Sequence, residues 1–394
     1  MSAIAGRLRA SAGRAGLRSS ARAPALGARL FSARPGPARR PGPGPVAPAA
    51  AAAAAAQAQA PAQQQQQQPA PAAPAAGGGD ALPAAIEASF LSLFAPDGPA
   101  AAPRVLQSWR RMCAGDAFER HWPGLGLQRC ASYLPGLPEP PPPFPDPASD
   151  PGYSWLLEVE AAADQIIEEF EAAMANPAAL EAAGNSVWVP AAREDALAYG
   201  PDWRTLVLMD RGDWDKFNSK LFPKTKKIIT DLKAPAVEVF FARQTAGTGI
   251  ASHTDDVNFI QTTHLGLRVP EGDCWMKCGD AEPRPWARGR VVIMDTSFMH
   301  ETHNGTDSDR YVLIMRHWHP GTTPVERVAL QFLCDCVDRG GTKFAANKAA
   351  KTLRALGLQS GAGGAAAGAP AAAAGGSAAG GGGKGKGGGG KKKR

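Results

Sequence analysis

The segment Ser-His-Thr-Asp-Asp at residues 252–256 places an imidazole and a carboxylate two positions apart in the chain. In an extended strand both side chains leave the same face, so His253 and Asp255 could bind one metal ion together. His300 lies 47 residues further on, just after an apolar run, and is the candidate third ligand. Two imidazoles and one carboxylate with open coordination positions are typical of non-haem iron oxygenases. The spacing therefore predicts an Fe(II) site made of His253, Asp255 and His300.

Arg310 follows His300 by ten residues and stands at the start of a β-rich run. A guanidinium inside a barrel needs a carboxylate partner, and the dicarboxylate 2-oxoglutarate could bind it through two parallel hydrogen bonds. The structural alternative is a surface ion pair between Arg310 and Asp307 or Asp309. If the first interpretation holds, the catalytic set is that of a dioxygenase that uses Fe(II), 2-oxoglutarate and O2.

The chain from about residue 133 to residue 327 resembles the aspartyl/asparaginyl beta-hydroxylase domain. Three segments carry the similarity: residues 253–267, with His-Thr-Asp-Asp-Val-Asn and later His-Leu-Gly-Leu, residues 286–300, and residues 310–320, which end in Trp-His-Pro. The resemblance implies a double-stranded β-helix in which His253 and His300 bind iron. It also implies that His264 and Arg310 bind the two carboxylates of 2-oxoglutarate.

The chain departs from the animal members of that family at three positions. Asp255 stands where they have glycine, so the complete ligand triad is similar to that of some bacterial and plant-type relatives. Thr262 replaces an arginine that meets the peptide substrate, and Ala242 replaces a serine near 2-oxoglutarate. The substrate therefore stays open between an Asp or Asn side chain of a peptide, a lipid and a small metabolite.

The elements that must position these residues are short β-rich runs separated by turn signals. They lie at residues 237–242, 258–269, 274–278, 290–294 and 311–318. Several are apolar on both faces, as expected for strands between another sheet and covering helices. Together they predict a mainly β fold with flanking helices, in the form of a small antiparallel barrel or sandwich. The resemblance specifies a jelly-roll or cupin-like double-stranded β-helix core.

Helices are predicted before this β-rich part. Two short ones cover residues 83–94 and 104–112, where apolar residues recur at helical spacing. A longer one has a single apolar stripe from Leu156 to Met174, and the Asn-Pro pair at residues 176–177 ends it.

Composition divides the chain into five segments. Residues 1–79 hold nine arginines and no acidic residue, which is typical of an organellar transit peptide followed by a disordered low-complexity stretch. The rest divides into a helical leader at 80–132, the hydroxylase-like domain at 133–328, a C-terminal helical extension at 329–357 and a disordered Gly/Ala/Lys-rich tail at 358–394. The presequence favours the chloroplast over the mitochondrion as the destination.

The formal net charge of +7 suggests nucleic-acid binding, but the two ends carry fifteen of the 43 basic residues and no acidic one. Residues 80–357 thus hold 28 basic and 36 acidic residues, a net charge of −8. An acidic body argues against a nucleic-acid partner. No apolar run approaches the roughly 18 residues of a membrane span. We therefore expect a soluble monomer.

Two other function classes stay open at this stage. One is a zinc or manganese hydrolase on the same barrel, which would not need a buried dicarboxylate anchor such as Arg310. The other is a non-catalytic binding module. A separate zinc site at the cysteine pairs 274/278 and 334/336 is disfavoured because both lack the Cys-x-x-Cys spacing. His319 is expected to pack rather than bind metal, and His121 is expected to be structural in the helical leader.

Overall fold

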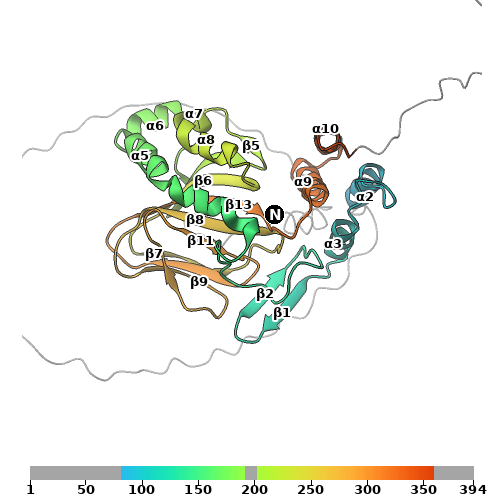
Figure 1. Cartoon of the computed structure of the whole chain (residues 1–394), viewed down its shortest axis with the longest axis horizontal. Helices are drawn as coiled ribbons and strands as arrows, with labels where there is room; N and C mark the ends of the chain where they lie inside the picture. Colours follow the sequence, from blue (N-terminus) through green and yellow to red (C-terminus); the bar gives the residue numbers. More distant parts are fainter. Residues whose placement is uncertain (1–80, 191–201, 359–394) are drawn as a thin grey trace, which may run out of the picture.

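Two antiparallel sheets form the centre of the computed structural model, which describes residues 81–190 and 202–358 of the chain (Figure 1). The large sheet has the order β11 (Val291–Met294), β8 (Ile260–Arg268), β13 (Arg310–Trp318), β6 (Ala236–Gln244), β4 (Trp203–Asp210) and β3 (Val189–Pro190), with β5 (Asp213–Trp214) paired to β4. The small sheet has the order β10 (Arg284–Pro285), β9 (Cys274–Cys278), β12 (His300–Asn304) and β7 (Thr248–His253).

The chain crosses between the two sheets again and again from β6 to β13. Strands β6, β8, β11 and β13 lie in the large sheet, whereas β7, β9, β10 and β12 lie in the small one. This order is that of a jelly roll closed from two facing sheets. The predicted double-stranded β-helix with flanking helices is confirmed.

The large sheet is buried on both faces. Its outer face is covered by α4 (Ser154–Ala161), α5 (Ala163–Met174), α6 (Pro177–Ala183), α7 (Asn218–Leu221) and α8 (Pro223–Asp231) (Figure 1). Alternation divides β8 accordingly: Leu265 and Leu267 join the core under the helices, while the alternate residues Thr262 and His264 contact Thr296 and Trp286 inside the barrel. Both faces of β8 are therefore buried, and only Arg268 at its end is exposed.

The predicted helix over residues 156–174 is wrong in one respect, because it is two helices that meet at Ala162. The break allows Leu156 and Val159 of α4 and Ile166 and Phe170 of α5 all to be fully buried against the sheet. One straight helix would have lifted one of these pairs away from the twisted sheet.

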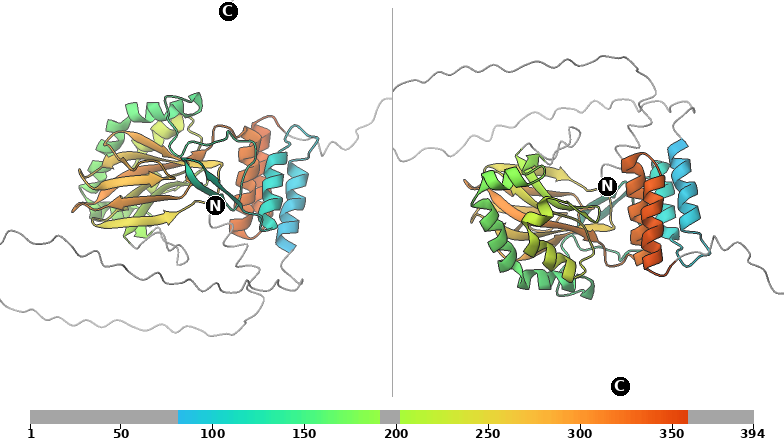
Figure 2. Two further views of the ribbon diagram at one scale, coloured as in Figure 1. Left: turned by 90° about the horizontal axis from the view of Figure 1, so that it is seen from below. Right: turned by 90° about the horizontal axis from the view of Figure 1, so that it is seen from above.

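The helical leader and the C-terminal extension form one body rather than two separate segments. We call α2 (Ala81–Leu93), α3 (Pro103–Cys113), α9 (Pro324–Arg339) and α10 (Lys343–Ala355) the four-helix unit (Figure 2). Phe332 of α9 contacts Phe90 of α2 with a ring separation of 6.2 Å. Because α9 starts at Pro324, the predicted domain boundary at residue 328 falls inside a helix.

The predicted leader is also not wholly helical. It contains a hairpin of β1 (Phe118–Trp122) and β2 (Gly126–Cys130), so His121 lies in a strand and not in a helix. The hairpin packs on the end of the small sheet, where the Asp280 N–H donates to the Leu125 carbonyl oxygen. The sequence pattern missed it because a two-sided, partly exposed hairpin has no clear apolar alternation.

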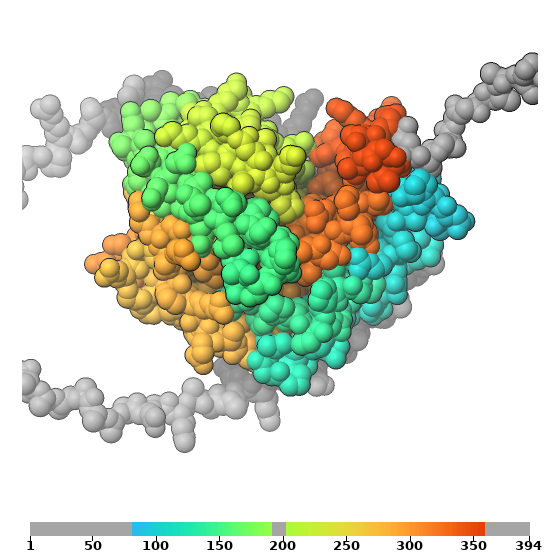
Figure 3. Space-filling view, in the orientation of Figure 1, coloured from blue at the N-terminus to red at the C-terminus, as the bar shows by residue number. Residues whose placement is uncertain are grey.

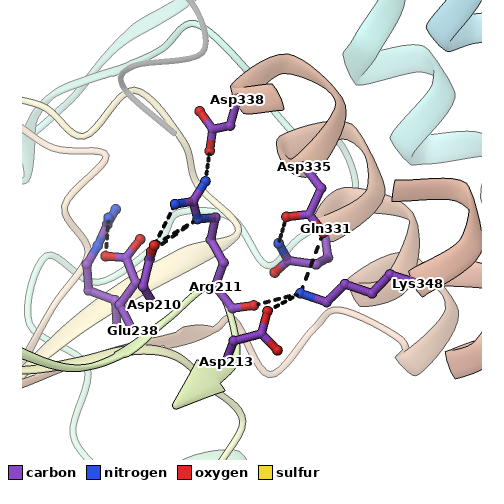
Figure 4. A network of polar contacts seen from close by, with 9 residues as sticks. Asp210, Arg211, Asp213, Glu238, Gln331, Asp335, Asp338 and Lys348 are labelled. Atoms are coloured by element: carbon purple, nitrogen blue, oxygen red, sulfur yellow. Dashed lines mark hydrogen bonds and ion pairs between the residues drawn. The ribbon is translucent and has the colours of Figure 1, made fainter. Parts of the chain in front are cut away.

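The C-terminal helices lie directly against the rest of the molecule (Figure 3), and ion pairs join the four-helix unit to the barrel (Figure 4). Arg211, in the turn after β4, binds Asp338 of α9 at 2.6 Å. Lys348 of α10 binds Asp213 at 2.9 Å and approaches Asp335 of α9 at 3.6 Å. The contacts attach both C-terminal helices to the same edge of the large sheet.

Gly279, directly after β9, should be the least replaceable glycine at the hairpin contact. Its φ is +58°, and a Cβ there would lie 2.0 Å from the Leu125 carbonyl oxygen. Gly340 is a matched control, with φ +65° and no atom within 4 Å of such a Cβ. Both alanine variants pay the left-handed strain of about 1 to 2 kcal/mol. Only Gly279→Ala also meets a clash, so it should lose about 1 to 3 kcal/mol more stability in urea unfolding. Equal losses would contradict this contact.

The described part of the chain contains six cysteines and no disulfide. Among the described helices none is long and apolar enough to cross a bilayer. The transit peptide at 1–79 and nearly all of the tail at 358–394 lie outside the described residues, so these two assignments stay predictions.

Candidate metal centre

The three predicted metal ligands come together where β7 ends and β12 begins. His253 is the last residue of β7 and the register partner of His300, the first residue of β12, and their ring centroids are 4.2 Å apart. The Oδ1 of Asp255 lies 3.9 Å from the Nε2 of His253. One donor atom from each of the three residues lies within 4.8 Å of the others, and this is the one such group of ligands in the described part of the chain.

Asp255 reaches the centre by a different route from the one that the sequence predicted. It lies two residues beyond the end of β7 and is not part of a strand. Its N–H donates to the carbonyl oxygen of Thr296 at 2.8 Å, which ties it to the segment before β12. The next residue, Asp256, has a φ of +61°, so the chain turns sharply just after the carboxylate.

Both histidines are oriented by their own backbone. The Nδ1 of His253 lies 2.8 Å from the carbonyl oxygen of Ala251, and the Nδ1 of His300 lies 2.9 Å from that of Phe298. A carbonyl oxygen can only accept, so each Nδ1 is a donor, and the lone pair of a neutral ring then lies on Nε2. This is the arrangement that orients metal-binding imidazoles in proteins.

The electrostatics keep the centre in the protonation state that binds metal. Burial raises the pKa of Asp255, but the charge of Arg316, with the two histidines, outweighs it and leaves that pKa below its ordinary value. Burial lowers the pKa of His300 to about 4, which outweighs the opposite effect of Asp255. Near neutral pH the centre therefore presents an anionic carboxylate and a neutral His300 imidazole.

Arg310 is a buried guanidinium in the same barrel. Its side chain is 1% exposed, and its Nε and Nη1 have no hydrogen-bond partner among the described residues. It stacks over the Trp286 ring at 4.1 Å, and burial lowers its pKa to about 10. The alternative of a surface pair with Asp307 or Asp309 is wrong, because Arg310 is buried and Asp309 binds Arg243 at 2.7 Å.

His264 lies close to both Arg310 and the ligand histidines. Burial, the charge of Arg310 and that of His300 together hold the pKa of His264 well below its ordinary value, so the ring is neutral. Its Nδ1 accepts a hydrogen bond from the Nε1 of Trp286 at 3.1 Å. The ring proton is therefore on Nε2, which leaves His264 as a hydrogen-bond donor.

Three other histidines near these residues in the sequence are not part of the group of metal-ligand candidates. His317 bonds Thr263 through its Nε2 at 2.8 Å, and His319 accepts from the Gly321 N–H at 2.9 Å. His303 is 40% exposed and lies 3.0 Å from Asp273. The packing role expected for His319 is confirmed.

The sequence analysis missed Arg316 and Glu238. Arg316 binds Glu238 through Nη1 at 3.0 Å and Asp255 through Nη2 at 3.3 Å. A signal was present, since Arg310 and Arg316 are six residues apart in one strand and so share its inward face. Alternation along β13 could therefore have pointed to Arg316.

The segment that contains this site is similar in sequence to known proteins. Residues 160–320 match the family model described as aspartyl/asparaginyl beta-hydroxylase. Residues 160–320 therefore carry the domain of this family, and the assignment is limited to that segment of the chain. The family segment contains all three metal-ligand candidates as well as His264, Arg310 and Arg316, so the whole candidate centre lies inside it.

Individual members of the beta-hydroxylase family match over part of their length. Human aspartyl/asparaginyl beta-hydroxylase is 31% identical over 135 residues, which are 33% of this chain and 17% of that protein. Human aspartate beta-hydroxylase domain-containing protein 2 is 32% identical over 140 residues, 34% of this chain and 37% of that protein. Human aspartate beta-hydroxylase domain-containing protein 1 is 44% identical over 73 residues, 18% of each chain. The chain thus spans well under half the length of these relatives.

One of the solved structures that match part of the chain is an oxidoreductase of the 2OG-Fe(II) oxygenase family from Burkholderia pseudomallei. It is 16% identical, with a TM-score of 0.26, over 38% of this chain and 81% of that one. The strand order described above carries the fold assignment.

Proposed function

We propose that this protein is an Fe(II)- and 2-oxoglutarate-dependent dioxygenase that hydroxylates an unactivated carbon. The observation that carries the proposal is Arg310, a fully buried guanidinium whose Nε and Nη1 meet no acceptor in the described residues. A buried charge without a partner is costly, so its position needs an anionic ligand to explain it. 2-Oxoglutarate would supply such a carboxylate to Arg310.

The donor set fits iron. His253, Asp255 and His300 would hold Fe(II) by two imidazoles and one carboxylate, which leaves open positions for the co-substrate and for O2. Bound Fe(II) supplies the chemistry in which oxidative decarboxylation of 2-oxoglutarate by O2 gives succinate and carbon dioxide and inserts the second oxygen atom into a C–H bond.

The protein's own residues bind and orient the co-substrate. Arg310 would receive the far carboxylate in a two-pronged contact, stacked on Trp286. The N–H at Nε2 of His264 would donate to a carboxylate oxygen without adding a charge. Apolar side chains between the sheets keep water out of this space: Ala242, Met276, Met294, Val312 and Ile314.

The names of the relatives indicate the first substrates to test, which are Asp and Asn side chains in peptides. A zinc or manganese hydrolase on this barrel would have no use for the buried Arg310. A non-catalytic module would need neither the oriented histidines nor the guanidinium.

Addition of Fe(II) and 2-oxoglutarate under anaerobic conditions should produce a weak visible charge-transfer band, because the keto acid chelates the metal through adjacent oxygens. Exposure to O2 should then yield succinate. Zn(II) in place of Fe(II) is the control and should give neither signal. If the purified protein holds stoichiometric zinc and iron never supports succinate formation, the dioxygenase proposal is overturned.

A further inference from the structure

Arg316 links the metal-ligand carboxylate to a second acid. Its Nη2 lies 3.3 Å from the Oδ2 of Asp255, and its Nη1 lies 3.0 Å from the Oε2 of Glu238. The side chains of Arg316 and Asp255 are 15% and 14% exposed, so this ion pair is largely shielded from water. Solvent and salt screen such a pair less than a surface pair.

The sheet register explains why these groups meet. Arg316 of β13 lies directly opposite Glu238 of β6 on one side and opposite Thr262 of β8 on the other. Thr262 in turn lies 3.5 Å from Thr296, whose carbonyl oxygen holds the Asp255 N–H. The side chain of Asp255 is thus bound by Arg316 of β13, and its backbone N–H is bound by Thr296 in the segment before β12.

The two oxygens of Asp255 have different surroundings. Oδ1 faces the Nε2 of His253, whereas Oδ2 is bound by Arg316. We propose that Arg316 is a positioning residue that holds Oδ2 and so presents Oδ1 alone to the metal, with Glu238 holding Arg316 in turn. This inference rests on the proposed metal centre.

Arg316 has two opposite effects on metal binding, because it orients Asp255 but also carries a positive charge. A guanidinium close to a divalent cation repels it, so charge alone predicts that removal of Arg316 strengthens metal binding. Glu238 offsets much of that repulsion because it neutralises the guanidinium at 3.0 Å. We therefore expect the lost orientation of the Asp255 carboxylate to outweigh the lost repulsion between Arg316 and the metal. Removal of the hydrogen-bond partner of a metal ligand lowers metal affinity by about 10- to 100-fold.

The experiment measures Co(II) and Mn(II) affinity of the full chain, together with the visible spectrum of bound Co(II), for Arg316→Gln, Arg316→Lys and Glu238→Gln. Arg316→Gln should bind metal about 10- to 100-fold more weakly, with a changed Co(II) spectrum. Arg316→Lys should fall between it and the wild type. Arg243→Gln is the matched control, because it breaks a similar ion pair with Asp309 that does not touch Asp255. Arg243→Gln should leave affinity and spectrum unchanged.

A second arm separates positioning from a general structural role. In Asp255→Gly the guanidinium of Arg316 faces the vacated position, so added formate should restore part of the lost metal affinity. In the double variant Asp255→Gly with Arg316→Gln, formate should have no effect. Rescue that depends on Arg316 is not expected from an arginine that only stabilises the sheet.

The outcomes distinguish this inference from the proposed function. If the wild type binds no divalent metal, the metal centre itself is wrong. If the wild type binds metal and Arg316→Gln binds it equally well or more tightly, the centre stands and the positioning role of Arg316 is overturned. Formate rescue that is the same with and without Arg316 would overturn it as well.

Discussion

Turnover should fall below detection at any 2-oxoglutarate concentration when His300 is replaced by alanine. The His300 side chain is 6% exposed, and its ring lies against that of His253. It offers one of the three ligand atoms of the candidate metal centre. Loss of a direct ligand should weaken Fe(II) binding by more than the roughly 10- to 100-fold that loss of an outer partner costs. Succinate formation and Mn(II) affinity measure the two effects.

His303→Ala is the control for that variant. His303 lies three residues further along the same strand, but its side chain is 40% exposed and pairs with Asp273. It should keep both activity and metal binding. Unchanged metal affinity in His300→Ala, with the fold intact by circular dichroism, would show that the metal binds elsewhere.

Arg310→Gln should raise the 2-oxoglutarate requirement by about 10- to 150-fold, since a charge-assisted hydrogen bond contributes about 1.5 to 3 kcal/mol. Metal binding should survive because Arg310 is not a ligand. Arg310→Lys should give an intermediate value, because an ammonium keeps the charge without the planar two-pronged contact. Titration of 2-oxoglutarate in the succinate assay measures the change. The same 2-oxoglutarate dependence in Arg310→Gln and wild type would mean that the anchor lies elsewhere.

A second substitution at Arg310 tests whether this residue binds the co-substrate or stabilises the fold. Without co-substrate, Arg310→Met should be as stable as the wild type or more stable by about 1 to 3 kcal/mol, because it removes a buried donor that has no acceptor. Added 2-oxoglutarate should raise the melting temperature of the wild type but not of the variant. A large loss of stability in Arg310→Met would mean that Arg310 supports the fold instead.

Much of the β-helix could be predicted from the sequence, because the central strands of the β-helix are buried on both faces. The predicted runs at 274–278 and 311–318 match β9 and β13 within one residue. The strand β12, His-Glu-Thr-His-Asn, was not predicted as a strand, because it carries a metal ligand and has few apolar residues. A pattern of hydrophobic residues cannot locate a strand whose inward face is polar.

The C-terminal helices show a different kind of omission. The sequence predicted a helical C-terminal extension, which corresponds to α9 and α10. It did not predict that these two helices pack against α2 and α3, which lie more than 200 residues earlier in the chain. Local periodicity holds no information on such a contact, since it depends on which apolar faces remain uncovered after the barrel closes.

The sequence by itself determined the identity of the site: the types and spacing of His253, Asp255, His300 and Arg310 name a two-histidine, one-carboxylate centre with a cationic anchor. The tertiary structure alone decided that Arg310 is buried without an acceptor at its Nε and Nη1, and that Arg316 holds the outer oxygen of Asp255. The physical reason is that residue type depends on the chain, whereas burial and partner depend on which strands become neighbours.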